Sequence, residues 1–241
     1  MNQRADSIRS SWRQEIRPCS NVLVLVNVVA FLGFAFLNLS ELFAWQRTWE
    51  LFGLSRTGVV DHWRFWQFIS SPFVHGGLTH LAFNMLALWM LGPDVENALG
   101  RVRFLLFCLS CALVSEFGFL LLAGNRGAIL IGWSGVIFGI LAAQAVLRPD
   151  SRLLLFGVFP LKMRHAVFLL GAMELYFTLD ATRRSGTAHL AHVFGALGGC
   201  AWMFILRRLA DQRAKRPPVA KRVPLPRPRF RPDRSDIPHE L

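Results

Sequence analysis

The sequence predicts an all-α membrane protein with six spanning helices, and its composition and hydropathy are the first evidence. The 241 residues are 53% hydrophobic and 17% charged, whereas soluble chains carry about 25% charged residues. Mean hydropathy is +0.38. The formal net charge is nevertheless +12, so the charges must be segregated from the apolar runs. This composition excludes a wholly disordered chain, a disulfide mini-protein and an ordinary soluble domain.

The first spanning helix is expected at residues 21–38. Residues 1–20 are polar and contain four arginines, and they form a predicted cytoplasmic N-terminal segment. The apolar run that follows is just long enough to cross a bilayer core. It continues into Leu39–Phe43 rather than a small-residue cleavage site, so the pattern favours an uncleaved membrane helix over a signal peptide.

Further apolar runs complete a predicted six-helix domain over residues 21–206. Residues 41–77 form a long outer loop with its own apolar and aromatic residues, which we expect to be partly embedded in the membrane. The apolar segment Leu153–Leu161 is too short to span and contains Pro160, so we expect it at the interface or capping the next helix. The five remaining spans are expected at 78–92, 104–122, 128–147, 165–180 and 188–206.

The basic residues predict the orientation of the chain. With the N-terminus inside, 21 of the 27 Lys and Arg residues fall in inner segments and 6 in outer ones. Inner loops of membrane proteins are enriched in Lys and Arg, so both termini are expected in the cytoplasm. Asp6 and Glu15 argue against a mitochondrial presequence, so a bacterial inner membrane is the expected location.

The C-terminal segment 207–241 has a different composition. It holds 11 Lys and Arg residues against 4 acidic ones, together with seven prolines. Such a composition predicts a disordered, partly polyproline tail. Attraction to anionic lipids of the inner leaflet is the favoured interpretation. Nucleic-acid binding is not expected, because no nucleic-acid-binding fold accompanies the tail.

The cysteines indicate neither a metal site nor a disulfide framework. Cys108 and Cys111 form a single C-x-x-C inside an apolar run, with no second pair. Zinc ribbons need two such pairs, so these are expected to be small buried side chains. No cofactor is expected.

The first polar cluster within the spans contains His75, His80 and Asn84. Polar residues in a spanning helix are costly and are therefore candidates for function. His80 and Asn84 are spaced i,i+4 and share a helix face, so two donors there could stabilise an oxyanion. A helix–helix hydrogen bond, or metal ligation by His75 and His80, remains open, although no H-E-x-x-H motif is present.

Two further clusters lie in the fourth and sixth spans. Ser134 is flanked by Gly132 and Gly135, a pattern that allows close approach of a substrate but is also typical of helix packing. Gly195 and Gly199 form a G-x-x-x-G face for close helix contact, and His192 lies three residues before it. Close packing of the two spans would bring His192 to Ser134.

These clusters fall at a similar depth, very roughly 5–12 Å below the outer surface. A nucleophile, a base and oxyanion donors at one depth predict an acyl-transfer site. Ser134 would attack and His192 would take its proton, while His80, Asn84 and the Ser134 backbone N–H would hold the oxyanion. We see no acid placed to orient the histidine, so a dyad is expected. Phe138, one turn after the serine, is expected to pack on the imidazole.

Three acidic residues lie in or beside the spans. Glu96 is expected to pair with Arg101 or Arg103 at an inner helix end. Glu116 and Glu174 are expected to face the protein interior, where structural pairing is favoured over a proton relay.

The motifs together resemble those of rhomboid intramembrane serine proteases. The matching stretches are Trp63-Arg64, His75-x4-His80-x3-Asn84, Gly132-x-Ser134-Gly135 and Ala191-His192-x-x-Gly195-x3-Gly199, between residues 20 and 206. The resemblance implies a six-helix core with a water-filled cavity open to the outside and a Ser134–His192 catalytic dyad. It also implies that His80 and Asn84 assist the oxyanion and that Trp63 and Arg64 belong to a structural first loop. Trp133 is bulkier than the residue usual in the family and is expected to narrow the cavity or alter substrate preference.

His189 is the alternative base, because it also follows an alanine, but the glycines at +3 and +7 favour His192. The predicted function is an intramembrane serine endopeptidase that cleaves transmembrane segments near the outer face, with entry past the second and fifth helices. The alternatives are a catalytically inactive rhomboid-like binding or quality-control factor, a transporter, and a metalloprotease using His75, His80 and His192.

Overall fold

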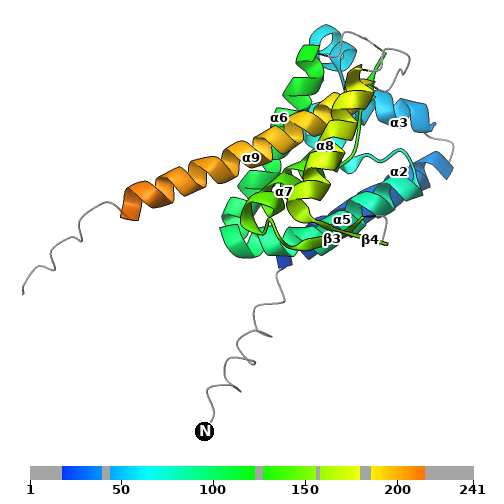
Figure 1. Ribbon diagram of the computed structural model, residues 1–241. Helices are drawn as coiled ribbons and strands as arrows, with labels where there is room; N and C mark the ends of the chain where they lie inside the picture. The colour runs from blue at the N-terminus through cyan, green and yellow to red at the C-terminus, as the bar shows by residue number, and fades with distance from the viewer. Residues whose placement is uncertain (1–17, 40–43, 123–126, 156–157, 180–185, 215–241) are drawn as a thin grey trace, which may run out of the picture.

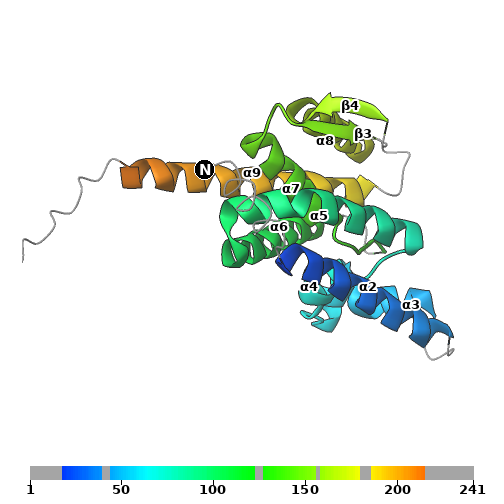
Figure 2. The same cartoon turned by 90° about the horizontal axis from the view of Figure 1, so that it is seen from below.

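The computed structural model describes residues 18–39, 44–122, 127–155, 158–179 and 186–214. Its long helices pack around α7, and the short helices and a strand of the first loop cover one end (Figures 1 and 2). The helices are α2 (Pro18–Leu39), α3 (Trp45–Phe52), α4 (Gln67–Ser70), α5 (Leu78–Leu99), α6 (Arg101–Leu122), α7 (Ser134–Leu147), α8 (Met163–Leu179) and α9 (Gly186–Ala214), with a π-helix η1 (Thr57–Asp61) and a 3₁₀-helix η2 (Ser71–Phe73). The strands are β1 (Leu54–Ser55), β2 (Ile129–Leu130), β3 (Arg152–Leu155) and β4 (Phe159–Lys162).

Each predicted span overlaps a helix of the structure, and three helices of the described chain are long and apolar enough to cross a membrane. These are the segments Cys19–Leu39, Arg101–Leu121 and His189–Gln212. Helix α7 is also mostly apolar but is shorter than these three. Helix α5 extends beyond the predicted 78–92 to Leu99 and accommodates Pro93 in its interior.

The described residues are mostly helical, and they also form two small antiparallel sheets that were not predicted. β1 pairs with β2, and β3 pairs with β4 in a hairpin. The described parts of the segment Leu153–Leu161, which was expected to lie at the interface or cap a helix, belong mostly to these two strands. The predicted span 128–147 begins too early, since β2 and a glycine with φ +97° at Gly132 precede α7. A left-handed backbone conformation cannot continue a right-handed helix.

The predicted C-terminal tail also begins too early. Helix α9 continues past residue 206 to Ala214, because Arg207–Ala214 contains good helix formers and no proline. Residues 215–241, and the N-terminal residues 1–17, lie outside the described part of the chain.

Helix α7 is the most enclosed element. It packs against α5, α6, α8 and α9, and nine of its residues between Gly135 and Gln144 are buried. The outer helices instead expose large apolar side chains, such as Leu25 of α2 at 61% and Phe83 of α5 at 69%. An apolar exterior around a packed centre suits a bilayer, because lipid tails solvate apolar side chains.

Glycines allow the backbones of α7 and α9 to touch. A Cβ atom on Gly195 would lie 2.8 Å from the carbonyl carbon of Gly135 and would overlap its oxygen. A Cβ atom on Gly199 would lie 2.7 Å from the Cα atom of Gly139. Both positions therefore require glycine, and the G-x-x-x-G face fixes α9 directly against α7.

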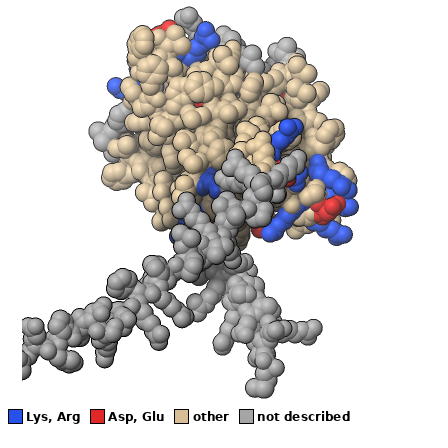
Figure 3. All heavy atoms as spheres, turned by 90° about the vertical axis from the view of Figure 1, so that its left-hand side faces the viewer, with Lys and Arg blue, Asp and Glu red and all other residues tan. Residues whose placement is uncertain are grey.

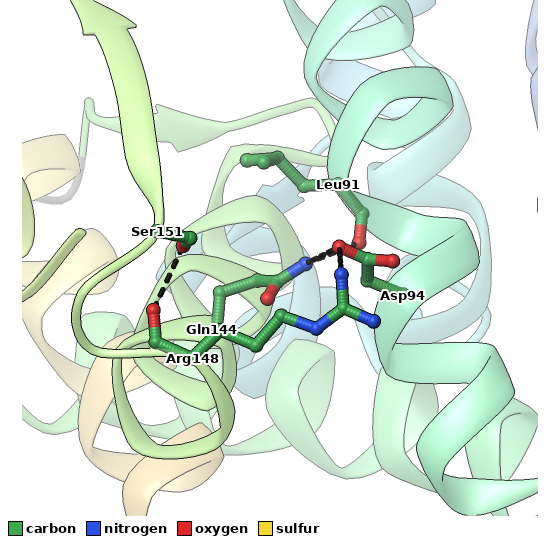
Figure 4. A network of polar contacts seen from close by, with 5 residues as sticks. All are labelled: Leu91, Asp94, Gln144, Arg148 and Ser151. Carbon is green, nitrogen blue, oxygen red and sulfur yellow. Dashed lines mark hydrogen bonds and ion pairs between the residues drawn. The ribbon is translucent and has the colours of Figure 1, made fainter. Parts of the chain in front are cut away.

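Polar contacts join α5 to α7 at the end opposite Ser134 (Figure 4). The Gln144 amide donates to the Leu91 carbonyl at 3.2 Å and to the Asp94 carboxylate at 3.1 Å, and Arg148 donates to the same carboxylate at 2.8 Å. The Ser151 hydroxyl donates to the Arg148 carbonyl at 2.8 Å and fixes the start of the hairpin. This network holds the two helices in register at one end.

Glu96 stabilises the start of α2 rather than pairing with Arg101 or Arg103, so that prediction is wrong. Its carboxylate accepts hydrogen bonds from the backbone N–H groups of Cys19 at 3.4 Å and Ser20 at 2.9 Å, and from the Ser20 hydroxyl. The first N–H groups of a helix have no partner within the helix and carry partial positive charge. A buried carboxylate from α5 satisfies them and joins the two helices.

Candidate active site

Ser134 and His192 meet where α7 and α9 pack together. Ser134 is the first residue of α7, directly after the turn at Gly132, and His192 lies near the start of α9. The Nε2 atom of His192 lies 2.7 Å from the Ser134 Oγ atom. The close approach of the two helices at Gly135 and Gly195 brings the side chains within hydrogen-bond distance. A hydroxyl hydrogen-bonded to an imidazole is the arrangement in which histidine can act as a base toward serine.

The imidazole of His192 is fixed from one side by an aromatic ring. Phe138 lies one turn after Ser134, and its ring stacks on His192 with centroids 4.6 Å apart and planes 6° from parallel. Such contacts between flat rings favour one orientation of the imidazole. Nε2 is thereby held toward the serine.

His80 and Asn84, on one face of α5, approach the turn before Ser134. A Cβ atom on Gly132 would lie 2.9 Å from the His80 Nε2 atom and 3.2 Å from the Asn84 Nδ2 atom. Position 132 therefore requires glycine, because a side chain would collide with His80 and Asn84 and because the backbone has φ +97°. The His80 Nδ1 atom accepts a hydrogen bond from the Gly76 N–H at 3.3 Å, so its neutral ring carries a proton on Nε2. Asn84 Nδ2 is buried and has no partner among the described residues.

His75 is buried beside His80, with ring centroids 5.2 Å apart. Both of its ring nitrogens lack a hydrogen-bond partner in the described ranges. Burial, and secondarily the neighbouring His80, lowers the pKa of His75 from its usual 6.5 to about 4. His75 is thus a neutral ring that packs behind His80, in the loop before α5.

The first loop supports the turn that carries Ser134. The pairing of β1 with β2 joins Leu54 to Leu130, and the Gly132 N–H donates to the Ser71 carbonyl at 2.9 Å. The Ser71 hydroxyl in turn donates to the carboxylate of Glu116 at 2.6 Å. Residues far apart in the sequence therefore fix the position of the turn.

Trp63 and Arg64 belong to the first loop, as the resemblance implied. Trp63 has φ +58° and a side chain that is 71% exposed. Arg64 donates to the Glu50 carbonyl at 3.1 Å and connects the loop to α3. These contacts lie within the first loop and between that loop and α3, and a structural role for the two residues stays a prediction.

Trp133 does not face the serine. Its side chain is buried, packs edge-on against Phe73 with centroids 6.3 Å apart, and lines an apolar pocket with Cys108 and Val136. The expectation that Trp133 narrows the cavity beside Ser134 is therefore not supported by its orientation. Its indole belongs to the apolar core.

A carboxylate, Glu174 of α8, lies behind His192, whereas the sequence predicted only that it faces the protein interior and pairs there. Its Oε2 atom lies 3.0 Å from the His192 Nδ1 atom and 2.6 Å from the His189 Nδ1 atom. His189 contacts this carboxylate, whereas His192 is the histidine that contacts Ser134. Glu174 lies about one and a half helical turns from the outer end of its span, which is a depth similar to that of Ser134 and His192. A comparison of depths could therefore have placed Glu174 beside them.

These three side chains form the candidate metal-ligand group of the described structure. The ligand atoms of Glu174, His189 and His192 lie within 4.8 Å of one another. Two imidazoles and a carboxylate are ligands that zinc accepts in proteins. The group differs from the histidine set considered above, which included His75 and His80.

Comparison with known proteins shows the family to which the chain belongs. The family model described as the Rhomboid domain matches residues 62–209, which is more than half of the chain. The chain belongs to the rhomboid family. It is a membrane-embedded protein, and the match covers the residues from the first loop through most of α9.

Several named rhomboid proteins are similar to the chain. YdcA of Bacillus subtilis is 25% identical over 199 residues, which cover 83% of this chain and 92% of that protein. Rhomboid protease GluP of the same organism is 33% identical over 101 residues, 42% of this chain and 19% of its own length. Rhomboid protein 1, mitochondrial, of Saccharomyces cerevisiae is 31% identical over 159 residues, 64% of this chain and 46% of its own length. The chain thus spans nearly all of one relative and less than half of the other two.

Proposed function

We propose that this rhomboid protein is an intramembrane serine endopeptidase in which Ser134 is the nucleophile and His192 is the general base. The observation that carries the proposal is the 2.7 Å contact between the His192 Nε2 and Ser134 Oγ atoms. Serine becomes a useful nucleophile only when a neighbouring base takes its proton. His189 is the weaker candidate, because it contacts Glu174 and Phe177, whereas His192 is the histidine that contacts Ser134.

The proposed reaction proceeds in two stages. The Ser134 Oγ atom attacks the carbonyl carbon of the scissile peptide bond while its proton moves to His192 Nε2. The tetrahedral intermediate then collapses, the C–N bond breaks, and the histidine gives that proton to the leaving amine. A water molecule, deprotonated by the same imidazole, hydrolyses the acyl-enzyme and restores the serine.

The proposed oxyanion donors come from two helices. Ser134 lies at the N-terminus of α7, where backbone N–H groups are free of helical partners. His80 Nε2 and Asn84 Nδ2 approach the same turn from α5. Removal of one oxyanion donor lowers kcat about 10²–10³-fold in a well-studied serine protease. Gly132 leaves room for His80 and Asn84, and Gly135 leaves room for Ser115 of α6.

The proposed substrates are transmembrane segments of other membrane proteins, cut near the outer face. A regular helix uses its carbonyl groups in internal hydrogen bonds, so the segment must unwind before a peptide bond can reach Ser134. Small or helix-breaking residues near the cut would favour unwinding. Entry past α5 and α8 is the proposed route.

The proposed setting is a bacterial inner membrane with both termini in the cytoplasm. The basic residues of the predicted inner segments support this orientation. Figure 3 views the protein from the side where α9 ends, and Lys and Arg side chains there gather at the rim of a mostly uncharged surface. Binding of anionic lipids by the C-terminal tail remains a prediction.

The test compares purified wild-type protein with Ser134→Ala and His192→Ala on a model transmembrane substrate, with and without a chelator. Matched controls are Ser110→Ala, which changes an α6 serine bonded to its own helix at the Leu106 carbonyl, and His165→Ala, an exposed histidine of α8. We expect cleavage by the wild type and both controls, unaffected by the chelator. We expect none by the two site variants.

Labelling by a fluorophosphonate probe separates the remaining alternatives. Labelling of wild type but not Ser134→Ala would support an activated serine even if the chosen substrate were not cut. Absence of both cleavage and labelling in the wild type would favour an inactive rhomboid-like binding protein. Cleavage by Ser134→Ala would disprove the assigned nucleophile.

A further inference from the structure

The far nitrogen of the His192 imidazole lies beside a largely buried negative charge. Glu174 Oε2 is 3.0 Å from His192 Nδ1. The side chains of Glu174, His189 and His192 are 14%, 22% and 17% exposed. Carboxylates within a spanning helix are costly and usually functional or paired. The two-residue mechanism proposed above uses only Nε2 of His192 and leaves this carboxylate without a role.

His189 holds the carboxylate in place from its other side. Its Nδ1 atom lies 2.6 Å from the same Oε2 atom, and its ring packs on Phe177 of α8 with centroids 5.1 Å apart. The rings of His189 and His192 are 6.2 Å apart and nearly perpendicular. One oxygen of Glu174 thus lies between the Nδ1 atoms of two histidines that are one turn apart on α9.

We propose that Glu174 is a positioning residue that fixes the tautomer of His192 and stabilises the imidazolium formed when Ser134 reacts. The proposal rests on the proposed function and extends the dyad to three residues. A neutral imidazole carries a single proton. A carboxylate beside Nδ1 places that proton on Nδ1, so the lone pair of Nε2 faces the serine hydroxyl.

The proton balance follows from this arrangement. When the Ser134 Oγ–carbon bond forms, the hydroxyl proton moves to Nε2, and the ring then carries protons on both nitrogens and a positive charge. Glu174 remains ionised and offsets that charge across the 3.0 Å contact. The Nε2 proton later leaves with the amine, and Nδ1 keeps its proton throughout.

The neighbourhood of the ring supports this assignment. The other titratable side chains that the described structure brings near His192 are His189 of α9 and His80 of α5, and neither is an anion. Ser134 and Phe138 of α7 complete the surroundings. Nδ1 makes no well-aligned hydrogen bond in the resting structure, and catalytic hydrogen bonds often become aligned only when substrate binds.

The first test compares Glu174→Gln with Glu174→Asp. Glutamine keeps the shape of glutamate but removes its charge, and its amide N–H₂ can donate to Nδ1 and so force the proton onto Nε2. We expect kcat to fall by about 100-fold and KM to change by less than about threefold. Replacing the carboxylate beside the catalytic histidine with the matching amide lowers kcat about 10⁴-fold in a serine protease with a three-residue site. Glu174→Asp keeps the charge and should recover at least about tenfold over the glutamine variant.

The matched control is Glu50→Gln, the same chemical change at an exposed carboxylate of α3. It should leave kcat unchanged. Melting temperatures of all variants are measured first. A role for Glu174 in packing alone predicts near-normal kcat for the glutamine variant, and a Glu174→Gln kcat within about threefold of wild type would overturn the proposal.

The second test needs no substitution at Glu174. Nitrogen-15 chemical shifts of labelled histidine rings distinguish Nδ1–H from Nε2–H, and the His192 signals are those missing from His192→Ala. We expect Nδ1–H in the wild type and Nε2–H in Glu174→Gln. A wild-type His192 protonated at Nε2 would contradict the proposal. Failure of the proposed function is distinct, because the wild type itself would then neither cleave substrate nor react with the fluorophosphonate.

Discussion

Replacing Gly195 by alanine is expected to separate Ser134 from His192 while leaving the helices folded. A methyl group at position 195 meets the backbone of Gly135, which no side-chain movement can relieve. The contact lies one residue after Ser134 on α7 and three residues after His192 on α9. The perturbation therefore acts directly on the spacing of the proposed dyad.

The size of the displacement follows from the geometry. The added Cβ would lie 2.8 Å from the Gly135 carbonyl carbon, and ordinary contact begins at 3.4 Å, so the helices must part by at least 0.6 Å, with more needed to clear the oxygen. A separation of about 1 Å would lengthen the Nε2–Oγ contact from 2.7 Å to about 3.7 Å. Hydrogen bonds to hydroxyl groups do not reach that far.

The assay is kcat on a transmembrane substrate together with the rate of fluorophosphonate labelling. Because a positioned base contributes about 10²–10⁴ in rate, we expect both rates to fall about 100-fold or more. Forced overpacking costs about 1–3 kcal/mol, so the melting temperature should fall only moderately.

The control is Gly171→Ala on α8, where an added methyl group meets nothing within 4 Å. Its kcat should equal that of the wild type. If Gly195→Ala retains more than half of the wild-type kcat, the inference that this glycine contact sets the distance between Ser134 and His192 is refuted.

Three further predictions concern the surroundings of the site. Phe138→Ala should lower kcat roughly two- to tenfold, because a ring contact is worth about 0.5–1.5 kcal/mol, and Phe138→Tyr should keep nearly full rate. Zinc ions should inhibit cleavage by binding at Glu174, His189 and His192. A metal on the Nδ1 atom of His192 leaves the ring proton on Nε2, where the base must be free to accept the serine proton. The inhibition curve of His189→Ala should shift to higher zinc concentration, and an unchanged curve would argue against this site. Burial lowers the pKa of His75 to about 4, so this side chain remains neutral in the folded protein, whereas in the unfolded chain it takes up a proton below about pH 6.5. The contribution of His75 to stability is therefore full above that pH and falls by about 2 kcal/mol by pH 5. Melting curves of His75→Gln should lack this part of the pH dependence.

Much of the architecture could be predicted from local sequence patterns. The apolar runs gave the approximate positions of the long helices, because the length and hydropathy of a spanning helix are properties of one segment. The G-x-x-x-G spacing in α9 indicated a close helix contact, and the structure places Gly195 and Gly199 against the backbone of α7. The depth of Ser134 and His192 in their spans likewise indicated that the two side chains could meet.

The partners of buried charges could not be predicted in the same way. Glu96 was expected to pair with a nearby arginine, but it accepts hydrogen bonds from the start of α2, more than 70 residues away. A carboxylate can pair equally well with an arginine or with free backbone N–H groups. Only the packing of α2 on α5 decides between them.

Local sequence patterns were enough to identify a membrane protein of the rhomboid type, with its serine and histidine motifs at one depth. The length of an apolar segment and the spacing of its glycines are properties of that segment alone, so they can be recognised in the sequence. The tertiary structure decided the rest: that β1 and β2 hold the turn before α7, that Trp133 points into the apolar core, and that Glu174 lies behind His192. Each of these depends on how side chains and backbone from distant parts of the chain pack together, which no local pattern in the sequence specifies.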